Sequence, residues 1–289
     1  PSVREVFFMS VSGQTGKTER SGKFRRGWRR IWPPLLLAVL FAALLQLFSV
    51  IGILREFVLP APTDVIKALV SQHQLLIPHI RATLSVSVLG FLLSIIVGVF
   101  VALLMDSFAP VYRAVYPWLV ISQTIPTLVI TPVIVLILGY GWWPRLAVVV
   151  LVCFFPIGIS LFQGLRSVDN DLIMLLRSMQ AKRRQIFLHV KLPAGLTTMF
   201  SGLKIAATYC VMAATLAEWS GGGDGLGIYM LRTKRSFNYD RMFASIIWII
   251  ALSLLFYAAV VLAEYLLLPW HRSNGEERRL KNEKITENN

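Results

Sequence analysis

The sequence predicts an all-α membrane protein with about six transmembrane helices. Its 289 residues are 56% hydrophobic and only 15% charged, and the mean hydropathy of +0.65 is far from that of a water-soluble domain. Several apolar segments also reach the roughly 20 residues that a helix needs to cross a bilayer core of about 30 Å. These observations predict one transmembrane domain over residues 34–270, between a basic tail (1–33) and a polar tail (271–289).

The first predicted span covers residues 34–54, where Gln46 is the main polar interruption. The segment before it carries eight Lys or Arg residues against only Glu5 and Glu19. Cytoplasmic flanks of membrane helices are enriched in Lys and Arg, so we expect a cytoplasmic N-terminus. The apolar run is longer than that of a signal peptide and ends in LREFVLP, which favours an uncleaved anchor.

Five further spans are predicted along the rest of the chain. They lie at about residues 84–105, 118–138, 147–165, 196–217 and 243–268, and Pro126 and Pro132 interrupt the second of these. The cytoplasmic pieces would be both tails, a short turn near Arg113 and the segment 166–191, which together hold most of the positive charge. The cluster between Arg232 and Arg241 opposes this orientation locally. The overall charge distribution still places both termini in the cytoplasm.

Several chemical functions are disfavoured by the sequence. VSGQTGKT (residues 11–18) is close to a phosphate-binding loop, but Val11 replaces its first glycine and no α/β domain fits before the first span. The four histidines and two cysteines form no metal-ligand spacing, and the cysteines read as small buried hydrophobes. We therefore expect no cofactor, metal or catalytic site. The net charge of +14 lies at membrane flanks without a nucleic-acid-binding pattern, so membrane lipids are the expected partner.

The loop 166–195 has an amphipathic pattern that predicts two short helices. Asp169 or Asn170 can cap the first, apolar residues from Leu172 to Met179 form one face, and a turn is expected near Gln180. The second follows from Lys182 to His189, and Pro193 begins the next span. The apolar face of the first helix either binds a separate protein or rests on the chain's own membrane domain.

This loop resembles the coupling motif of binding-protein-dependent ABC permeases. The motif reads Glu-Ala-Ala, three residues, Gly, nine residues, Ile or Val, one residue, Leu-Pro. Val190, Leu192 and Pro193 match its end in register, whereas Met174, Leu175 and Leu176 stand at Glu-Ala-Ala and Gln180 at the glycine. VLPAPTDV (58–65), SQTIPTLVITPVIVLILGYG (122–141), GLRSVDNDL (164–172) and AEWSGGGDGLGIYM (217–230) are similar to the sulfonate, taurine and nitrate permeases and the thiamine-pyrimidine-precursor permeases.

The resemblance, which covers about residues 54–270, implies a type I ABC importer permease in the cell membrane of a bacterium. It implies three partners: a separate ABC ATPase, an extracytoplasmic solute-binding protein and a second permease copy in a homodimer. The solute would be a thiamine pyrimidine precursor, with a sulfonate or similar small anion as the alternative. The residues assigned to ATPase coupling are Asp171, Met174, Leu175, Leu176, Gln180, Ala181, Phe187, Val190, Leu192 and Pro193.

A translocation pathway is expected where polar groups and helix breaks lie within spans, because non-helical backbone at membrane depth requires protein or water beside it. Each hydroxyl can instead bond to its own helix. The glycine loop (residues 220–227) resembles the family's gate on the outer side. The predicted pathway residues are Gln123, Thr127, Thr131, Tyr209, Thr215, Glu218 and Trp219.

Two other function classes remain as alternatives. An ATP-independent secondary carrier or channel would carry solute without a partner, but Asp106, Glu218 and Glu264 lie near span ends, where they do not form a proton relay. A membrane-embedded enzyme would need polar groups clustered at one membrane face. The sequence therefore favours a permease driven by ATP hydrolysis elsewhere.

Overall fold

The structure, a computed structural model, describes residues 32–33, 36–37, 39–49, 51 and 60–269. It divides into two units, residues 1–67 and 68–289, which are described separately. In the first unit the apolar helix Val39–Ser49 lies inside the predicted first span. The rest of that span, and nearly all of both predicted tails, fall outside the described residues. Helix α3 (Pro62–Ser71) runs across the boundary between the units.

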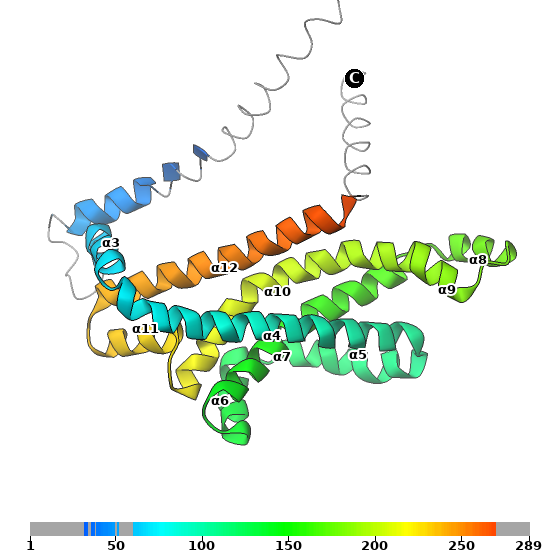
Figure 1. The fold of residues 1–289 in the computed structure, drawn as a ribbon, viewed down its shortest axis with the longest axis horizontal. Helices are drawn as coiled ribbons and strands as arrows, with labels where there is room; N and C mark the ends of the chain where they lie inside the picture. Colours follow the sequence, from blue (N-terminus) through cyan, green and yellow to red (C-terminus); the bar gives the residue numbers. More distant parts are fainter. Residues whose placement is uncertain (1–31, 34–35, 38, 50, 52–59, 270–289) are drawn as a thin grey trace, which may run out of the picture. The chain divides into compact units, whose positions relative to one another are not determined.

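The second unit is built from helices, and no strand occurs among the described residues (Figure 1). In chain order its elements are α4 (His73–Ser107), α5 (Ala109–Thr124), α6 (Thr127–Leu138), α7 (Trp142–Arg166), α8 (Asn170–Ser178), α9 (Arg183–Ile186), the π-helix η1 (Phe187–Lys191), α10 (Leu192–Gly221), α11 (Leu226–Arg235) and α12 (Tyr239–Leu267).

Four stretches of the described chain are long and apolar enough to cross a membrane. They are α4, α7, α12 and the continuous run Arg183–Gly221, which joins α9, η1 and α10. The pair α5 and α6 passes the same test together but bends by 107° at residues 125–126. All five spans predicted between residues 84 and 268 therefore correspond to helices, although α4, α7 and α10 extend beyond the predicted limits at both ends and α12 begins earlier than predicted.

The third predicted span needs correction. It begins at Ala109, well before Trp118, and the expected turn near Arg113 is wrong because Arg113 lies inside α5. The chain instead turns at Phe108, whose extended backbone separates α4 from α5. Pro110 suits the start of α5, where the missing amide costs nothing. The bend falls at Pro126, as the sequence suggested, while Pro132 is accommodated inside α6.

Helix α7 forms the centre of the unit and packs most extensively against α10 and α4. Its residues Val148, Cys153 and Ile157 are fully buried. A Cβ on Gly98 of α4 would meet the Phe154 carbonyl oxygen at 2.9 Å, so glycine lets the two backbones approach. Cys153 and Cys210 are free and buried, which confirms their reading as small hydrophobes.

The outer surface of α12 is apolar, as expected for a helix in contact with lipid. Leu254, Leu262 and Leu266 are each more than half exposed. In water this arrangement would expose a large hydrophobic patch, which monomeric soluble proteins rarely do. Burial in the bilayer removes that cost.

Candidate functional site

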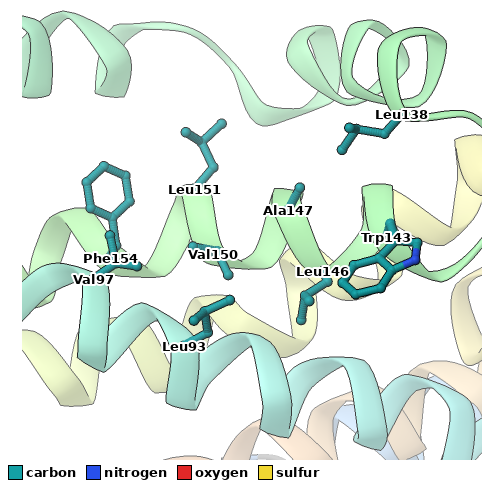
Figure 2. A pocket seen from close by; sticks show the side chains of 9 residues that line it. All are labelled: Leu93, Val97, Leu138, Trp143, Leu146, Ala147, Val150, Leu151 and Phe154. Atoms are coloured by element: carbon teal, nitrogen blue, oxygen red, sulfur yellow. The ribbon is translucent and has the colours of Figure 1, made fainter.

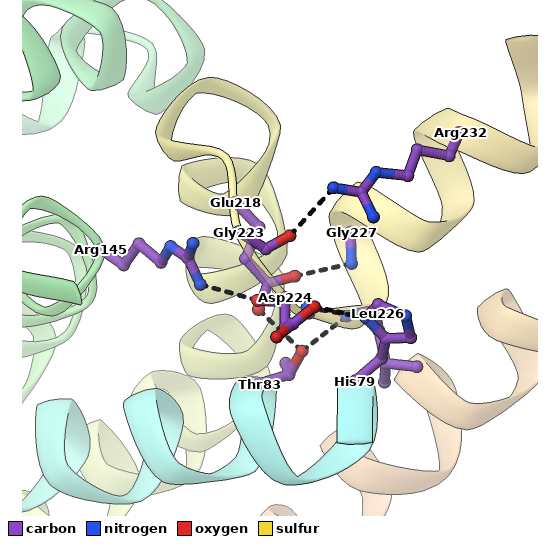
Figure 3. Close-up of polar contacts among 10 residues, drawn as sticks. His79, Thr83, Arg145, Glu218, Gly223, Asp224, Leu226, Gly227 and Arg232 are labelled. Carbon is purple, nitrogen blue, oxygen red and sulfur yellow. Dashed lines mark hydrogen bonds and ion pairs between the residues drawn. The ribbon is translucent and has the colours of Figure 1, made fainter. Parts of the chain in front are cut away.

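The glycine loop and the buried carboxyl group of Glu218 form one polar cluster, which we call the gate cluster (Figure 3). Glu218 lies in the last turn of α10 and is fully buried. Its carboxyl accepts a hydrogen bond from the Thr83 hydroxyl (2.7 Å) and another from the Gly227 amide (2.6 Å). The second bond satisfies one of the free amides at the start of α11. One side chain thus connects α10 with α4 and α11.

Thr83 and one further side chain of α4, His79, hold the same loop. The Thr83 oxygen, while donating to Glu218, accepts from the Leu226 amide at 2.8 Å. The His79 Nδ1 accepts from the Gly225 amide at 3.0 Å, so this nitrogen carries no proton. The His79 ring also lies 5.1 Å from that of Tyr229 on α11, and burial raises the pKa of Tyr229 above its ordinary value.

Arginines from α7 and α11 complete the gate cluster. Arg145, which is buried, donates from its Nη1 to the carbonyl oxygen of Asp224 at 2.7 Å. Arg232 reaches the Gly223 carbonyl oxygen at 3.4 Å. Figure 3 shows these donors approaching the loop from different sides. The loop is therefore fixed by contacts with four helices: α4, α7, α10 and α11.

Glycine is required at position 225 of this loop. Its backbone has φ 151°, a conformation that L-residues rarely adopt, and a Cβ there would collide with the Glu218 carboxyl. The sequence showed that the loop was rich in glycine. Only the structure shows that one of these glycines makes room for a buried acid.

A separate cavity of about 460 Å³ lies beside the bend between α5 and α6. We call it the bend cavity. Helices α7 and α10 supply its remaining walls. Its lining residues are Gln123, Thr127, Val152, Phe155, Pro156, Ile159, Ser160, Ile205, Tyr209 and Met212.

The structure brings together only some of the predicted pathway residues. Gln123, Thr127 and Tyr209 all line the bend cavity. Thr131 and Thr215 do not, since both are buried with hydroxyls that donate to carbonyl oxygens of their own helices. Their role in the pathway stays a prediction.

The remaining two predicted pathway residues lie near the other end of α10. Glu218 belongs to the gate cluster, whereas its neighbour Trp219 is 37% exposed and outside the bend cavity. The assignment of both residues to the pathway likewise stays a prediction.

A second cleft, of about 480 Å³, has a different chemical character (Figure 2). It lies between α4 and α7 beside the end of α6. Of the described side chains that line it, all are aliphatic or aromatic. They are Leu93, Val97, Leu138, Trp143, Leu146, Ala147, Val150, Leu151 and Phe154. This cleft can hold apolar groups but has little with which to recognise a polar solute.

The loop 166–195 forms the two predicted helical pieces at the opposite end of the unit from α11 (Figure 1). Asp169 is the N-cap of α8, and its carboxylate accepts from the Asp171 amide at 2.9 Å. The predicted turn at Gln180 is confirmed: its φ is 60°, and Ala181 donates to the Leu176 carbonyl oxygen. This is a Schellman ending, in which glycine is the usual left-handed residue.

The apolar side chains of α8 are left open to the surroundings. No residue within α8 is buried. Met174 and Leu175 are exposed by 64% and 58%, and Met179, just beyond the helix, by 71%. Leu176 is half-buried. Of the two readings left open, this geometry disfavours the one in which the apolar face rests on the membrane domain.

The second half of the loop is packed more closely. Phe187 and Val190 lie in η1 and are half-buried, and Leu192 and Pro193 begin α10. Lys191 makes an ion pair of 2.7 Å with Asp106 at the end of α4. A π-helical turn inside an α-helical run is rare and often marks a functional position. The ion pair connects this turn to the membrane helices.

Sequence reasoning missed His79, Thr83 and Arg145 as members of the gate cluster. Thr83 and Glu218 are separated by 135 positions in the chain. Single polar residues at such separations have no shared periodicity or motif. The one available signal was the cost of placing polar side chains in membrane-spanning helices, which predicts that they have partners.

Comparison with known proteins identifies the family to which this architecture belongs. The sequence pattern of the family described as binding-protein-dependent transport system inner membrane component matches residues 94–268. The chain is 34% identical over 249 residues to the formylaminopyrimidine transport permease protein ThiX of Halalkalibacterium halodurans, covering 86% of this chain and 99% of that protein.

The chain is also similar to a second permease in sequence and to a chain of an ABC transporter in structure. The SsuC permease of Bacillus subtilis, assigned to aliphatic sulfonates, is 29% identical, covering 88% of this chain and 92% of its own length. A chain of the MetNI methionine ABC transporter in an inward-facing crystal form superposes with a TM-score of 0.56 at 21% identity, covering 66% of this chain and 94% of that chain.

Proposed function

The chain belongs to the family of binding-protein-dependent transport system inner membrane components, and it is an ABC transporter permease; from this premise we propose how it works. Two copies face each other and form the pathway of an importer. A separate ATPase binds loop 166–195, and an extracytoplasmic solute-binding protein delivers the solute. The permease performs no chemistry and alternates between conformations whose balance ATP binding shifts.

The exposed apolar face of α8 is the observation that carries this proposal. The helix is capped at both ends and therefore well formed, yet Met174 and Leu175 contact little of their own chain. An ordered helix with exposed apolar side chains outside the membrane helices favours a protein partner. Lys191 and Asp106 then connect the docked segment to α4.

The proposed orientation follows from the same assignment. The α8 end of the unit faces the cytoplasm, where ATP is available, and the gate cluster faces the outside, where solute arrives. The positive charge of loop 166–195 supports this orientation. The cationic residues at the end of α11 oppose it, as they did in the sequence.

For the solute we propose a pyrimidine precursor of thiamine, with an aliphatic sulfonate as the alternative. The first rests on the similarity to the formylaminopyrimidine permease over 99% of that protein's length. The second rests on the lower similarity to SsuC. Both solutes are small, and both relatives are permeases.

Purification and reconstitution test the proposal. The tagged chain should co-purify with an ATPase, and the complex in vesicles should import solute only when ATP is hydrolysed. An ATP-independent carrier would instead import solute without the ATPase. Uptake by vesicles that contain this chain alone would therefore overturn the proposal.

A further inference from the structure

The polar side chains of the bend cavity have no hydrogen-bond partner among the residues that the structure describes. Within the part of the chain that the structure describes, the side chains of Gln123, Thr127, Ser160 and Tyr209 make no hydrogen bond. Neighbouring hydroxyls behave differently: Ser122 and Thr208 donate to carbonyl oxygens of their own helices. The bend cavity therefore collects free hydrogen-bonding groups from α5, α6, α7 and α10.

The bend adds free backbone groups to the same place. Helix α5 ends at Thr124 and α6 begins at Thr127, and at such ends carbonyl and amide groups lack helical partners. A smaller cavity of about 60 Å³ shares Gln123 and Thr127 on its wall. Backbone left unpaired at membrane depth is tolerated where it is buried in protein or lines a water-filled cavity, and the bend lies beside a cavity.

The character of the lining limits what can bind. None of the described residues that line the bend cavity is charged. An anion transferred there would lose its hydration without gaining a cationic partner, which is strongly unfavourable. A neutral solute loses much less. The lining therefore selects against sulfonates and other small anions.

The aromatic and apolar residues of the bend cavity favour a solute that is a flat ring. Phe155 and Tyr209 contribute aromatic rings to the lining, and Pro156, Ile159 and Met212 complete apolar walls. Gln123 supplies both a donor and an acceptor, which suits a ring that carries an amino group beside a ring nitrogen. The volume of about 460 Å³ falls within the range of small-molecule sites.

We infer that the bend cavity is a binding site for a neutral, flat nitrogen heterocycle, held by Gln123, Thr127 and Tyr209 on its way through the permease. This inference rests on the proposed function, because it assigns the solute class of the same pathway. It adds a residence site and excludes anions from it.

The test uses the permease in vesicles with the ATPase that co-purifies with it and the solute-binding protein. The probes are a radiolabelled formylaminopyrimidine and ethanesulfonate. We expect ATP-driven import of the pyrimidine alone. Gln123→Leu should lower that import about tenfold and Tyr209→Phe about threefold, the range for losing one or two hydrogen bonds. The matched control Thr208→Val removes a neighbouring hydroxyl outside the cavity and should import normally.

The outcomes separate this inference from the proposed function. ATP hydrolysis should be equal in all variants, so a lost pyrimidine signal reports the cavity. Normal pyrimidine import by both cavity variants, import of ethanesulfonate, or import of neither probe by a complex that hydrolyses ATP would overturn the inference. Pyrimidine import without ATP would overturn the proposed function, while the variants would still report the cavity.

Discussion

The segments that connect the membrane helices differ at the two ends of the second unit. At one end, the glycine loop is held by the gate cluster, in which Glu218, Thr83 and Arg145 each bond to the loop or its flanking helices. At the other end, α8 is capped at both ends, has no buried residue and exposes Met174 and Leu175. The first segment is satisfied within the described chain, and we propose that the second is completed by another protein.

This difference indicates which end is rigid in the isolated subunit. Removing a member of the gate cluster leaves buried polar groups without partners and should destabilise the fold. Changing an exposed side chain of α8 removes few contacts within the described chain. Stability and partner binding are therefore expected to respond to separate sets of substitutions, and the experiments below test this separation.

The largest expected effect is an all-or-none difference in accessibility. Tyr140 lies in the loop near the gate cluster and is 83% exposed, and Met174 on α8 is 64% exposed. In spheroplasts expressing the chain alone, Tyr140→Cys should react with a membrane-impermeant maleimide, whereas Met174→Cys should react only after lysis. The native cysteines are buried and give little background. The reverse pattern would invert the proposed orientation.

A stability effect follows for the gate cluster. Glu218→Ala leaves the Thr83 hydroxyl and the Gly227 amide without their acceptor. Each buried donor left unpaired costs about 1–3 kcal/mol, so the melting temperature of the purified permease should fall clearly. Thermal unfolding in detergent measures this.

Ser245→Ala is the matched control for the gate cluster. Its hydroxyl is also buried but donates only to the Met242 carbonyl oxygen of the same helix. Removing the hydroxyl leaves no buried donor unpaired, and the Met242 carbonyl oxygen can still accept its hydrogen bond within the helix. The expected change in melting temperature is therefore small. Equal destabilisation by the two variants would show that the cluster has no special role.

Binding of the ATPase should respond to substitutions in α8, at the other end of the unit. A buried leucine side chain is worth about 1.5–3 kcal/mol, so Leu175→Asp should weaken ATPase binding by roughly ten- to a hundredfold or more, because it also places an unpaired charge in the contact. The melting temperature of the permease should stay unchanged, since Leu175 is exposed. Co-purification of the ATPase measures the effect.

Phe237→Asp provides the control for that experiment. Phe237 is 68% exposed and lies beyond α11, at the far end of the unit. It makes the same change from apolar to acidic but should retain the ATPase. Full ATPase binding and ATP-driven uptake by Leu175→Asp would mean that α8 is not the coupling element.

Much of this fold could be predicted because membrane helices are specified by local composition. The apolar runs gave α4, α7, α10 and α12, and the capping signal at Asp169 gave α8. The start of α5 was misplaced because Arg113 was read as a loop residue, whereas it lies in a helix. A single charge near a helix end is a weak boundary signal.

The sites were less predictable because they depend on contacts between distant positions. Gln123, Thr127 and Tyr209 were grouped by their polarity within apolar runs, and the structure places them on one cavity, while their role in the pathway stays a prediction. Thr131 and Thr215 carry the same signal, yet their hydroxyls bond to their own helices. Sequence alone does not show which way a helical threonine points, and it gave no link between Thr83 and Glu218.

The smallest expected effect concerns two helices, one at each end of the unit, that both end with a residue in the left-handed conformation. Gln180 after α8 has φ 60° and Phe237 after α11 has φ 58°, and both close Schellman endings. A left-handed backbone costs a non-glycine residue about 1–2 kcal/mol, while glycine adds entropy to the unfolded chain. Gln180→Gly should therefore stabilise α8 by about 1 kcal/mol and slow its amide hydrogen exchange about fivefold.

Phe237→Gly should gain less, because it also removes a ring contact. The Phe237 ring lies 6.3 Å from that of Tyr239 in an edge-to-face arrangement, and such pairs are worth about 0.5–1.5 kcal/mol. In Phe237→Gly the two effects nearly cancel, so amide hydrogen exchange in α11 should change little. In Gln180→Gly, by contrast, amide hydrogen exchange in α8 should slow. Hydrogen exchange measured on both variants gives the comparison. Faster exchange in α8 of Gln180→Gly would mean that the glutamine side chain stabilises the turn by more than its backbone strain costs, and that α8 is not improved by the family's glycine.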